Sequence, residues 1–223
     1  MPASGLHVNR VVSMPFDENT YIAHFDGRND CVVFDPGFEP RLILDYLDKR
    51  SLTPAAIVCT HGHSDHIAGN GALKNRWPDC PLVIGVGDAP KLTDPELNLS
   101  APFGASLVSP PHDRTVDNGD RFTAGGLELE VLAAPGHSSG HVVFLCRQCQ
   151  PWQVFGGDVL FQGSIGRTDF SDGDFDALRE AIHTKLFTLP DDTIVLPGHG
   201  PATTIGHEKR TNPFVGAPAG YIA

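Results

Sequence analysis

Residues 61–66 read HGHSDH and place three histidines and one aspartate within six positions. The apolar run 57–60 leads into this segment, so we expect it at the end of a buried strand. Imidazole nitrogens and carboxylate oxygens bunched this tightly are typical of sites that hold metal ions. Side chains that require polar partners would otherwise be a costly choice next to a buried strand. The segment therefore predicts a metal site.

Three further polar residues follow predicted strands and have glycines before them. They are His137 after the strand 127–133, Asp158 after the strand 152–156, and His199 after the strand 193–196. Glycine lets the backbone approach closely, and the ends of strands are where sheet proteins gather functional groups from distant positions. We therefore expect these three side chains to join the HGHSDH segment.

Together these motifs provide seven candidate metal ligands: His61, His63, Asp65, His66, His137, Asp158 and His199. One zinc ion takes three or four protein ligands, so seven suit two divalent ions if one carboxylate is shared. Asp158 is the candidate bridge, because an ionised carboxylate has two oxygens. Zinc is the first expectation for both ions, and iron or manganese also accept this ligand set. His141 and His207 lie near the motifs but are not favoured as ligands. The histidines assigned no role are His7, His24, His112 and His183.

The hydrophobic pattern predicts the elements that must position these residues. Apolar runs bounded by Gly, Pro and Asp predict strands at 7–14, 19–26, 31–34, 56–60, 82–86, 127–133, 141–146, 152–156 and 193–196. Apolar residues at helical spacing predict helices at 40–50, 66–76 and 174–187. The CxxC of Cys146 and Cys149 is expected in a hairpin turn, because it lacks the second cysteine pair that a metal site needs. Strands followed by helices in each half suit two packed sheets with helices outside.

Size and charge limit the classes of function. At 223 residues, 40% of them hydrophobic, the chain fits one large domain or two small ones. Its net charge of −11 repels phosphate backbones, so nucleic acid is not expected as a partner. No apolar run suits a membrane span, and residues 1–19 lack the pattern of a secretory leader. Five cysteines without framework spacing favour a reducing, cytoplasmic location.

The ordered motifs resemble those of the metallo-β-lactamase superfamily over nearly the whole chain. The matching segments are residues 60–66 (THGHSDH), 135–137 (PGH), 157–158 (GD) and 197–199 (PGH). The resemblance implies an α+β fold: an αββα sandwich of two packed mixed sheets with helices on the outer faces, formed by residues 1–223 as one domain. It also implies a first metal held by His61, His63 and His137, a second held by Asp65, His66 and His199, and Asp158 as the bridge.

Within the superfamily, the chain is most similar to the type II glyoxalases, the hydroxyacylglutathione hydrolases, in their short bacterial form. The segment 163–167 aligns with the stretch where those enzymes place a cation for the glutathione carboxylate. Arg167 is therefore the candidate substrate-binding residue, with a structural salt bridge as its alternative role. Residues 201–223 are expected to form a short tail in place of the helical domain of those enzymes. The common lactamases have cysteine at the position of Asp158, which argues against β-lactam hydrolysis.

The predicted activity is metal-dependent hydrolysis of a small-molecule thioester such as S-lactoylglutathione. Two ions would lower the pKa of a bound water from ~15.7 to near 7 and provide a bridging hydroxide. Asp65 would ligate one ion and orient this nucleophile, which makes it the candidate catalytic residue. No general acid is obvious, which favours a thiolate leaving group, whose parent pKa is ~8.5–9, over an amine.

Two other functions fit parts of the pattern. Persulfide dioxygenases share the HxHxDH motif and the segment 166–170, and hold one iron through the matches to His61, His137 and Asp158. A non-catalytic metal-binding module is the other alternative, although a complete set of seven ligands argues against it. The sequence leaves open the metal, the acyl group and the oligomeric state.

Overall fold

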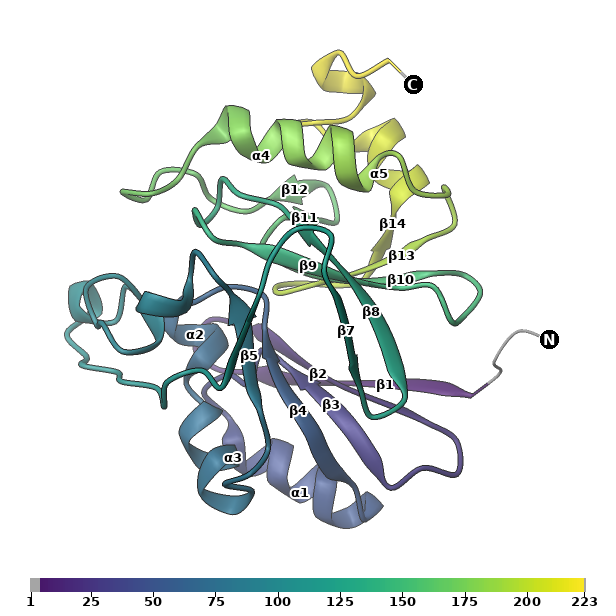
Figure 1. The fold of residues 1–223 in the computed structure, drawn as a ribbon. Helices are drawn as coiled ribbons and strands as arrows, with labels where there is room; N and C mark the ends of the chain where they lie inside the picture. Colours follow the sequence, from purple (N-terminus) through teal and green to yellow (C-terminus); the bar gives the residue numbers. More distant parts are fainter. Residues whose placement is uncertain (1–4, 223) are drawn as a thin grey trace.

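The computed structural model describes residues 5–222. Residues 1–4, which begin the stretch where no secretory leader is expected, and residue 223 lie outside this range. Two six-stranded mixed sheets pack face to face, with helices on their outer sides (Figure 1). This arrangement confirms the predicted αββα sandwich. Within the described residues, no helix combines the length and the apolar character needed to cross a membrane.

The first sheet delivers the HGHSDH segment. Its strands, in spatial order, are β1 (Leu6–Ser13), β2 (Glu18–Phe25), β3 (Asp30–Phe34), β4 (Thr53–Cys59), β5 (Leu82–Gly85) and β6 (Arg114–Val116). Strands β1 to β3 are antiparallel, whereas β3 to β6 run parallel. The carboxyl ends of the parallel strands therefore meet at one edge, where β4 runs into His61.

The second sheet delivers the remaining candidate ligands. Its strands, in spatial order, are β14 (Thr203–Thr204), β13 (Ile194–Pro197), β10 (Gln153–Gly157), β9 (Val142–Cys146), β8 (Leu127–Ala133) and β7 (Arg121–Ala124). A two-stranded ribbon of β11 (Leu160–Phe161) and β12 (Ser164–Ile165) follows β10. Because β10 and β13 are parallel neighbours, Asp158 and His199 leave the sheet at the same edge.

Helices seal the outer face of each sheet (Figure 1). The first sheet is covered by α1 (Pro40–Arg50) and α3 (Asn70–Arg76), and the second by α4 (Phe175–Ala181) and α5 (Ile205–Thr211). Between the sheets, the rings of Phe34 and Phe155 stack at 3.8 Å with an interplanar angle of 6°. Phe34 precedes Asp35, and Phe155 lies three positions before Asp158. Packing of these two buried rings therefore positions the strand ends that carry the site.

The predicted helix 66–76 is interrupted. It is divided into α2 (Ser64–Ile67) and α3, with Gly69 between them. The Gly69 N–H donates to Pro36 O at 2.7 Å, and a Cβ at Gly69 would lie 2.9 Å from Gly37 O. The loop after β3 therefore approaches the boundary between the two helices so closely that a side chain at position 69 would collide with it. The helical spacing of apolar residues in the sequence gives no sign of this long-range contact.

The other predicted elements agree with the structure in kind. The helix 40–50 has the predicted bounds, and the helix 174–187 continues from α4 as a π-helix over Ile182–Leu186. Strands β9 and β10 form the hairpin predicted around the CxxC, and both cysteines are buried and free. The short strands β6, β7, β11, β12 and β14 and the helix α5 were not predicted. In the segment after His199, β14 pairs with β13, and the side chain of Ile205 is buried against the second sheet.

Candidate metal centre

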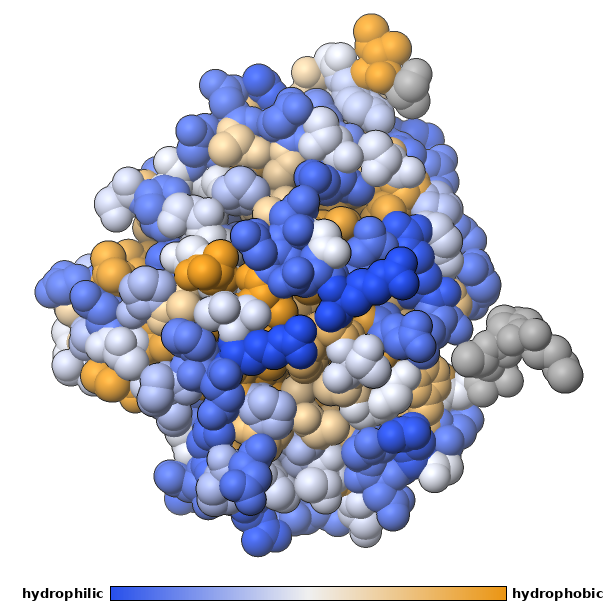
Figure 2. Space-filling view, viewed as in Figure 1, coloured by the Kyte–Doolittle hydropathy of each residue, from blue (hydrophilic) through white to orange (hydrophobic). Residues whose placement is uncertain are grey.

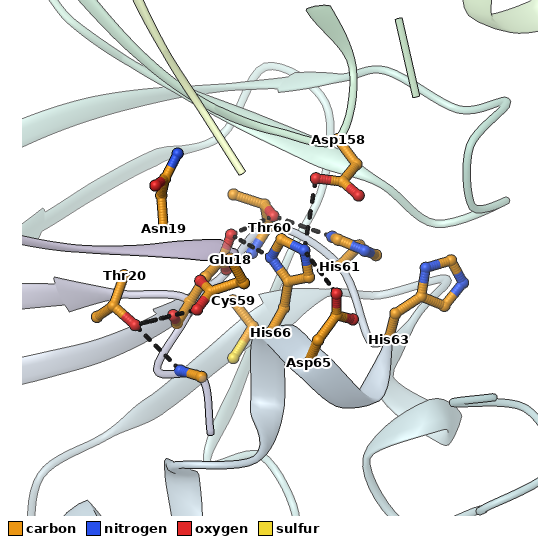
Figure 3. Close-up of polar contacts among 12 residues, drawn as sticks. Glu18, Asn19, Thr20, Cys59, Thr60, His61, His63, Asp65, His66 and Asp158 are labelled. Carbon is orange, nitrogen blue, oxygen red and sulfur yellow. Dashed lines mark hydrogen bonds and ion pairs between the residues drawn. The ribbon is translucent and has the colours of Figure 1, made fainter. Parts of the chain in front are cut away.

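The HGHSDH segment curls over the edge of the first sheet (Figure 3). His61 follows β4, His63 is the extended residue before α2, and Asp65 and His66 lie in the single turn of α2. His61 and His66 are fully buried, His63 is 4% exposed, and Asp65 is partly exposed. The short helix therefore turns Asp65 and His66 toward the second sheet rather than into solvent.

Loops of the second sheet bring His137, Asp158 and His199 to the same place. His137 and Asp158 are buried, and the side chain of His199 is 25% exposed. A Cβ at Gly198 would lie 2.2 Å from Asp158 Oδ1 and 2.6 Å from His66 Cε1. Glycine before His199 is therefore required by the close approach of the two sheets.

The candidate ligands gather into two donor groups whose ligand atoms lie within 4.8 Å of one another. The first group is His61, His63 and His137, and the second is Asp65, His66 and His199. Asp158 lies between them. Its Oδ2 is 3.4 Å from Nε2 of both His137 and His199, and its Oδ1 is 3.4 Å from His66 Nε2. One carboxylate thus faces members of both groups.

The donor set fits a pair of divalent cations. Two ligand atoms each ~2.1 Å from one ion, at a tetrahedral angle, lie ~3.4 Å apart, which matches the Asp158 distances. His63 faces the first donor group through Nδ1, which lies 2.9 Å from His137 Nε2. Nε2 of His61 and of His66 and Oδ1 of Asp158 are buried and lack a hydrogen-bond partner. Buried polar atoms in proteins normally have partners, so unpartnered atoms that converge on one place indicate ligand positions.

Backbone carbonyls orient two of the histidines. His137 Nδ1 donates to Arg167 O, and His199 Nδ1 donates to Phe16 O, each at 2.9 Å. Because a carbonyl oxygen only accepts, each Nδ1 carries a proton, and each ring is oriented with its Nε2 toward the site.

The buried carboxylate of Asp35 connects to a histidine of each donor group through hydrogen bonds. Asp35 accepts from the Thr60 N–H and the Thr60 hydroxyl, both at 2.7 Å, and from His66 Nδ1 at 3.1 Å. Thr60 Oγ1 also lies 3.1 Å from His61 Nδ1 (Figure 3). Asp35, His61 and His66 also form a cluster that could hold an ion. However, hydrogen bonds already use both oxygens of Asp35, so it serves to orient His66.

A second buried network joins the loops that carry the first donor group. Asp88 accepts from Gly62 N at 2.8 Å, from the Ser138 hydroxyl at 2.6 Å and from Gly140 N at 2.9 Å. Lys91 is 5% exposed and donates to Ser138 and, at 2.7 Å, to Asp172. The loops around His61 and His137 are therefore held together by one carboxylate and one ammonium group.

The first donor group has the electrostatics of neutral imidazoles. Burial lowers the pKa of His61 well below its usual value. Burial, with His137 and Lys91 nearby, lowers the pKa of His63 to about 3. A neutral imidazole is the form that binds a metal, so these side chains need lose no proton on binding.

The second group is an ion-pair cluster. Burial opposes the charged form of His199, but Asp158 and Asp65 outweigh it and raise its pKa to about 10. The same carboxylates raise the pKa of His66 well above its usual value against burial. In turn, His66 and His199 hold the pKa of Asp158 well below its usual value despite burial. In this cluster, the protons on His66 and His199 balance the carboxylate charges that bound metal cations would otherwise balance.

Sequence reasoning missed two buried residues of the site. Asp35 and His141 are both absent from the seven candidate ligands. His141 Nε2 accepts from Asp158 N at 3.1 Å, and its ring stacks on His61 at 4.8 Å. Asp35 directly follows the strand β3, so the strand-end rule that selected His137 could also have found it. His207, which is also not favoured as a ligand, lies on α5 with its side chain 45% exposed.

A solvent-open pocket with a volume of about 260 Å³ leads to the donor groups. Its polar lining includes His63, Asp65, His137, Asp158, Arg167 and His199. Arg167 forms a two-pronged ion pair with Asp169, with Nε and Nη2 each 2.9 Å from one carboxylate oxygen. The candidate substrate-binding cation therefore lines the pocket and already has a partner.

The fold and the site define a class of metal-dependent hydrolases. The family model described as "Metallo-beta-lactamase superfamily" matches residues 14–199, and the chain belongs to this superfamily. It is 39% identical to "Probable metallo-hydrolase YqgX" of Bacillus subtilis over 90% of this chain and 93% of that protein. It is 36% identical to "Hydroxyacylglutathione hydrolase GloC" of Haemophilus influenzae over 90% of this chain and 93% of that protein.

Similar solved structures agree with this family assignment. The BLEG-1 B3 metallo-beta-lactamase superposes with a TM-score of 0.89 at 37% identity, covering 94% of this chain and 99% of that chain. TTHA1623 in a di-iron-bound form superposes with a TM-score of 0.82 at 38% identity, covering 93% and 100%. ETHE1 from Myxococcus xanthus has a TM-score of 0.76 at 30% identity, covering 95% and 85%. The fold is thus shared by proteins whose names indicate different activities.

Proposed function

We propose that this chain is a metal-dependent thioester hydrolase of the hydroxyacylglutathione hydrolase type. The observation that carries the proposal is the position of Asp158, whose two oxygens face members of two groups of candidate ligands. The similarity to the Haemophilus influenzae hydroxyacylglutathione hydrolase supports hydrolysis of a thioester as the reaction. S-lactoylglutathione is the substrate to test first.

The proposed cofactors are two divalent ions, with zinc as the first expectation. The proposed ligands are His61, His63 and His137 for one ion, Asp65, His66 and His199 for the other, and Asp158 for both. When bound, such ions supply Lewis acidity that activates water near neutral pH and polarises a carbonyl. The similar structure of TTHA1623 in a di-iron-bound form supports iron as an alternative metal for this ligand set.

The chain's own residues have defined tasks in this proposal. Asp65 Oδ2 lies 3.4 Å from His199 Nε2 and 3.8 Å from His66 Nε2, so Asp65 orients the attacking water at the second group. Apart from the proposed ligands, Arg167 is the one ionisable side chain among the described residues that line the pocket. An arginine stays protonated and makes a poor proton donor. The pocket therefore suits a leaving group that departs as a thiolate and needs no proton.

Hydrolysis of S-lactoylglutathione by protein loaded with zinc, iron or manganese tests the proposal. We expect release of free thiol, detected with a thiol reagent, and loss of this activity in Asp158→Ala. A β-lactam should be assayed in parallel, because a similar structure is named a B3 metallo-beta-lactamase. Turnover of the β-lactam without turnover of any thioester would overturn the proposal.

A mononuclear iron dioxygenase acting on persulfides is the second candidate. His61, His137 and Asp158 would supply its two-histidine, one-carboxylate site, and Asp158 Oδ2 lies 3.4 Å from His137 Nε2. Oxygen consumption with glutathione persulfide and one iron per chain would favour this reading. A fully metallated protein without either activity would favour a non-catalytic metal-binding module.

The proposed partner is a small molecule, and the proposed location is the cytoplasm. All five cysteines are free and buried, which agrees with a reducing compartment. The net charge of −11 supports the absence of a nucleic-acid partner.

A further inference from the structure

The pocket above the donor groups is aromatic. Phe16 from the β1–β2 turn, Phe103 from the segment after β5, Phe161 from β11 and Phe170 from the loop before α4 all line it. We refer to these four residues as the aromatic collar. Leu99 and Ile165 complete the apolar lining. Four separate segments thus contribute phenylalanine to one small opening.

Two rings of the aromatic collar lie against histidines of the two donor groups. The ring of Phe170 lies 5.2 Å from the ring of His63 and 5.6 Å from that of His137. The ring of Phe161 lies 6.0 Å from that of His199, and Phe16 meets Phe103 edge-on at 5.8 Å. A carbonyl placed over the donor groups would therefore have aromatic rings on both sides.

Part of this apolar surface is open to water. Phe103 is 66% exposed and Phe16 is 39% exposed. Figure 2 shows further apolar surface on the left of the molecule, over the segment that follows β5 in Figure 1. Exposed apolar side chains at the mouth of a pocket indicate contact with a ligand, because they otherwise leave hydrophobic area in water.

The charges of the pocket do not suit the body of glutathione. Glutathione carries two carboxylates, and Arg167 is the only lysine or arginine among the described lining residues. Asp169 already neutralises Arg167 through two hydrogen bonds, and the Arg167 guanidinium lies 4.6 Å from the centre of the Phe170 ring. A substrate carboxylate could pair with this cation only through the N–H donors that Asp169 leaves free.

We infer that the substrate is a thioester with an apolar, preferably aromatic, body around the reacting carbonyl, and that the carboxylates of glutathione are not recognised. This inference rests on the proposed thioesterase function and names its substrate class. The aromatic collar binds the apolar body, and burial of that body supplies the selectivity.

Four thioesters test the inference: lactoyl and phenylacetyl groups, each carried on glutathione and on N-acetylcysteamine, which lacks both carboxylates. We expect kcat/KM for the phenylacetyl thioesters to exceed that for the lactoyl thioesters by at least ~tenfold on either thiol. We expect the glutathione and N-acetylcysteamine forms to differ by less than about threefold. A tenfold advantage for glutathione, or equal rates for both acyl groups, would overturn the inference.

Single-residue variants test the aromatic collar independently of the comparison of substrates. Phe103→Ala should lower kcat/KM for phenylacetyl-N-acetylcysteamine about five- to tenfold, mainly through KM. Phe175→Ala is the matched control, because Phe175 is also exposed, at 39%, but lies on α4 outside the pocket lining. Equal effects of the two variants would count against the aromatic collar. If the metallated protein turns over none of the four thioesters, the thioesterase proposal itself fails, and the inference fails with it.

Discussion

His66 Nδ1 lies 3.1 Å from Asp35 Oδ2, and both side chains are buried behind the candidate metal centre. The same carboxylate oxygen accepts from the Thr60 hydroxyl, which in turn lies 3.1 Å from His61 Nδ1. One carboxylate thus orients a histidine of each donor group. Such outer partners fix the ring orientation and the tautomer of metal-binding histidines.

Asp35→Asn should weaken metal binding. The amide keeps the volume of the side chain but removes the charge and replaces one acceptor oxygen by a donor. We expect a loss in metal affinity of about 10- to 100-fold, measured by competition with a chromophoric chelator. Asp48→Asn is the control, because Asp48 forms an exposed ion pair with Arg76. Unchanged affinity in a folded Asp35→Asn protein would contradict the role assigned to Asp35.

Asp158→Asn should remove the proposed bridge between the two donor groups. An amide offers one good ligand oxygen where the carboxylate offers two, so one side chain can no longer serve both ions. We expect the metal content to fall from two ions toward one per chain and kcat/KM to fall more than ~100-fold. Elemental analysis and a thioester assay on the same sample measure both effects. Two tightly bound ions in the variant would show that Asp158 is not the bridge.

Metal binding should release protons at pH 7. In the metal-free protein, the carboxylates around His199 raise its pKa to about 10, so this histidine is protonated at neutral pH. A metal must displace that proton, so the apparent affinity should rise by up to about tenfold per pH unit until pH nears 10. Calorimetric titration in two buffers of different ionisation enthalpy measures the proton release. Binding heats that do not depend on the buffer would argue against this displacement.

Asp172 should stabilise the fold at neutral pH. Burial raises the pKa of Asp172, but hydrogen bonds from Lys91 and Ser139 N outweigh it and lower this pKa to about 2. Because the folded pKa lies below the usual ~3.9, the stabilisation is present above about pH 4 and is lost as the pH falls toward 2.

We therefore expect Asp172→Asn to lower the free energy of unfolding at pH 7 by about 1 kcal/mol, a value reduced for solvent screening. The difference in the free energy of unfolding between this variant and the unsubstituted protein should narrow between pH 5 and pH 3. Urea denaturation at pH 7, 5 and 3 measures it. A difference that stays constant over this range would exclude the charge of Asp172 as the cause.

Much of the site could be predicted because it is encoded locally. The HGHSDH segment, Pro135-Gly136-His137 and Pro197-Gly198-His199 each follow a run of apolar residues that is readable as a strand. The helix α1 has its predicted bounds because its apolar face and Pro40 at its start are local signals. The sequence alone therefore determined the sandwich fold, the superfamily and the candidate ligands.

The tertiary structure alone decided which groups stand next to these ligands. Asp35 lies 31 positions before His66, and no local period encodes the distance between them. The break at Gly69 lies in contact with Pro36, and the aromatic collar combines four segments that are separate in the sequence. Periodicity reports which face of an element is buried, whereas partners across the fold depend on how the two sheets pack. For this reason the identity of the candidate ligands was a property of the sequence, and the shape and charge of the pocket beside them were properties of the fold.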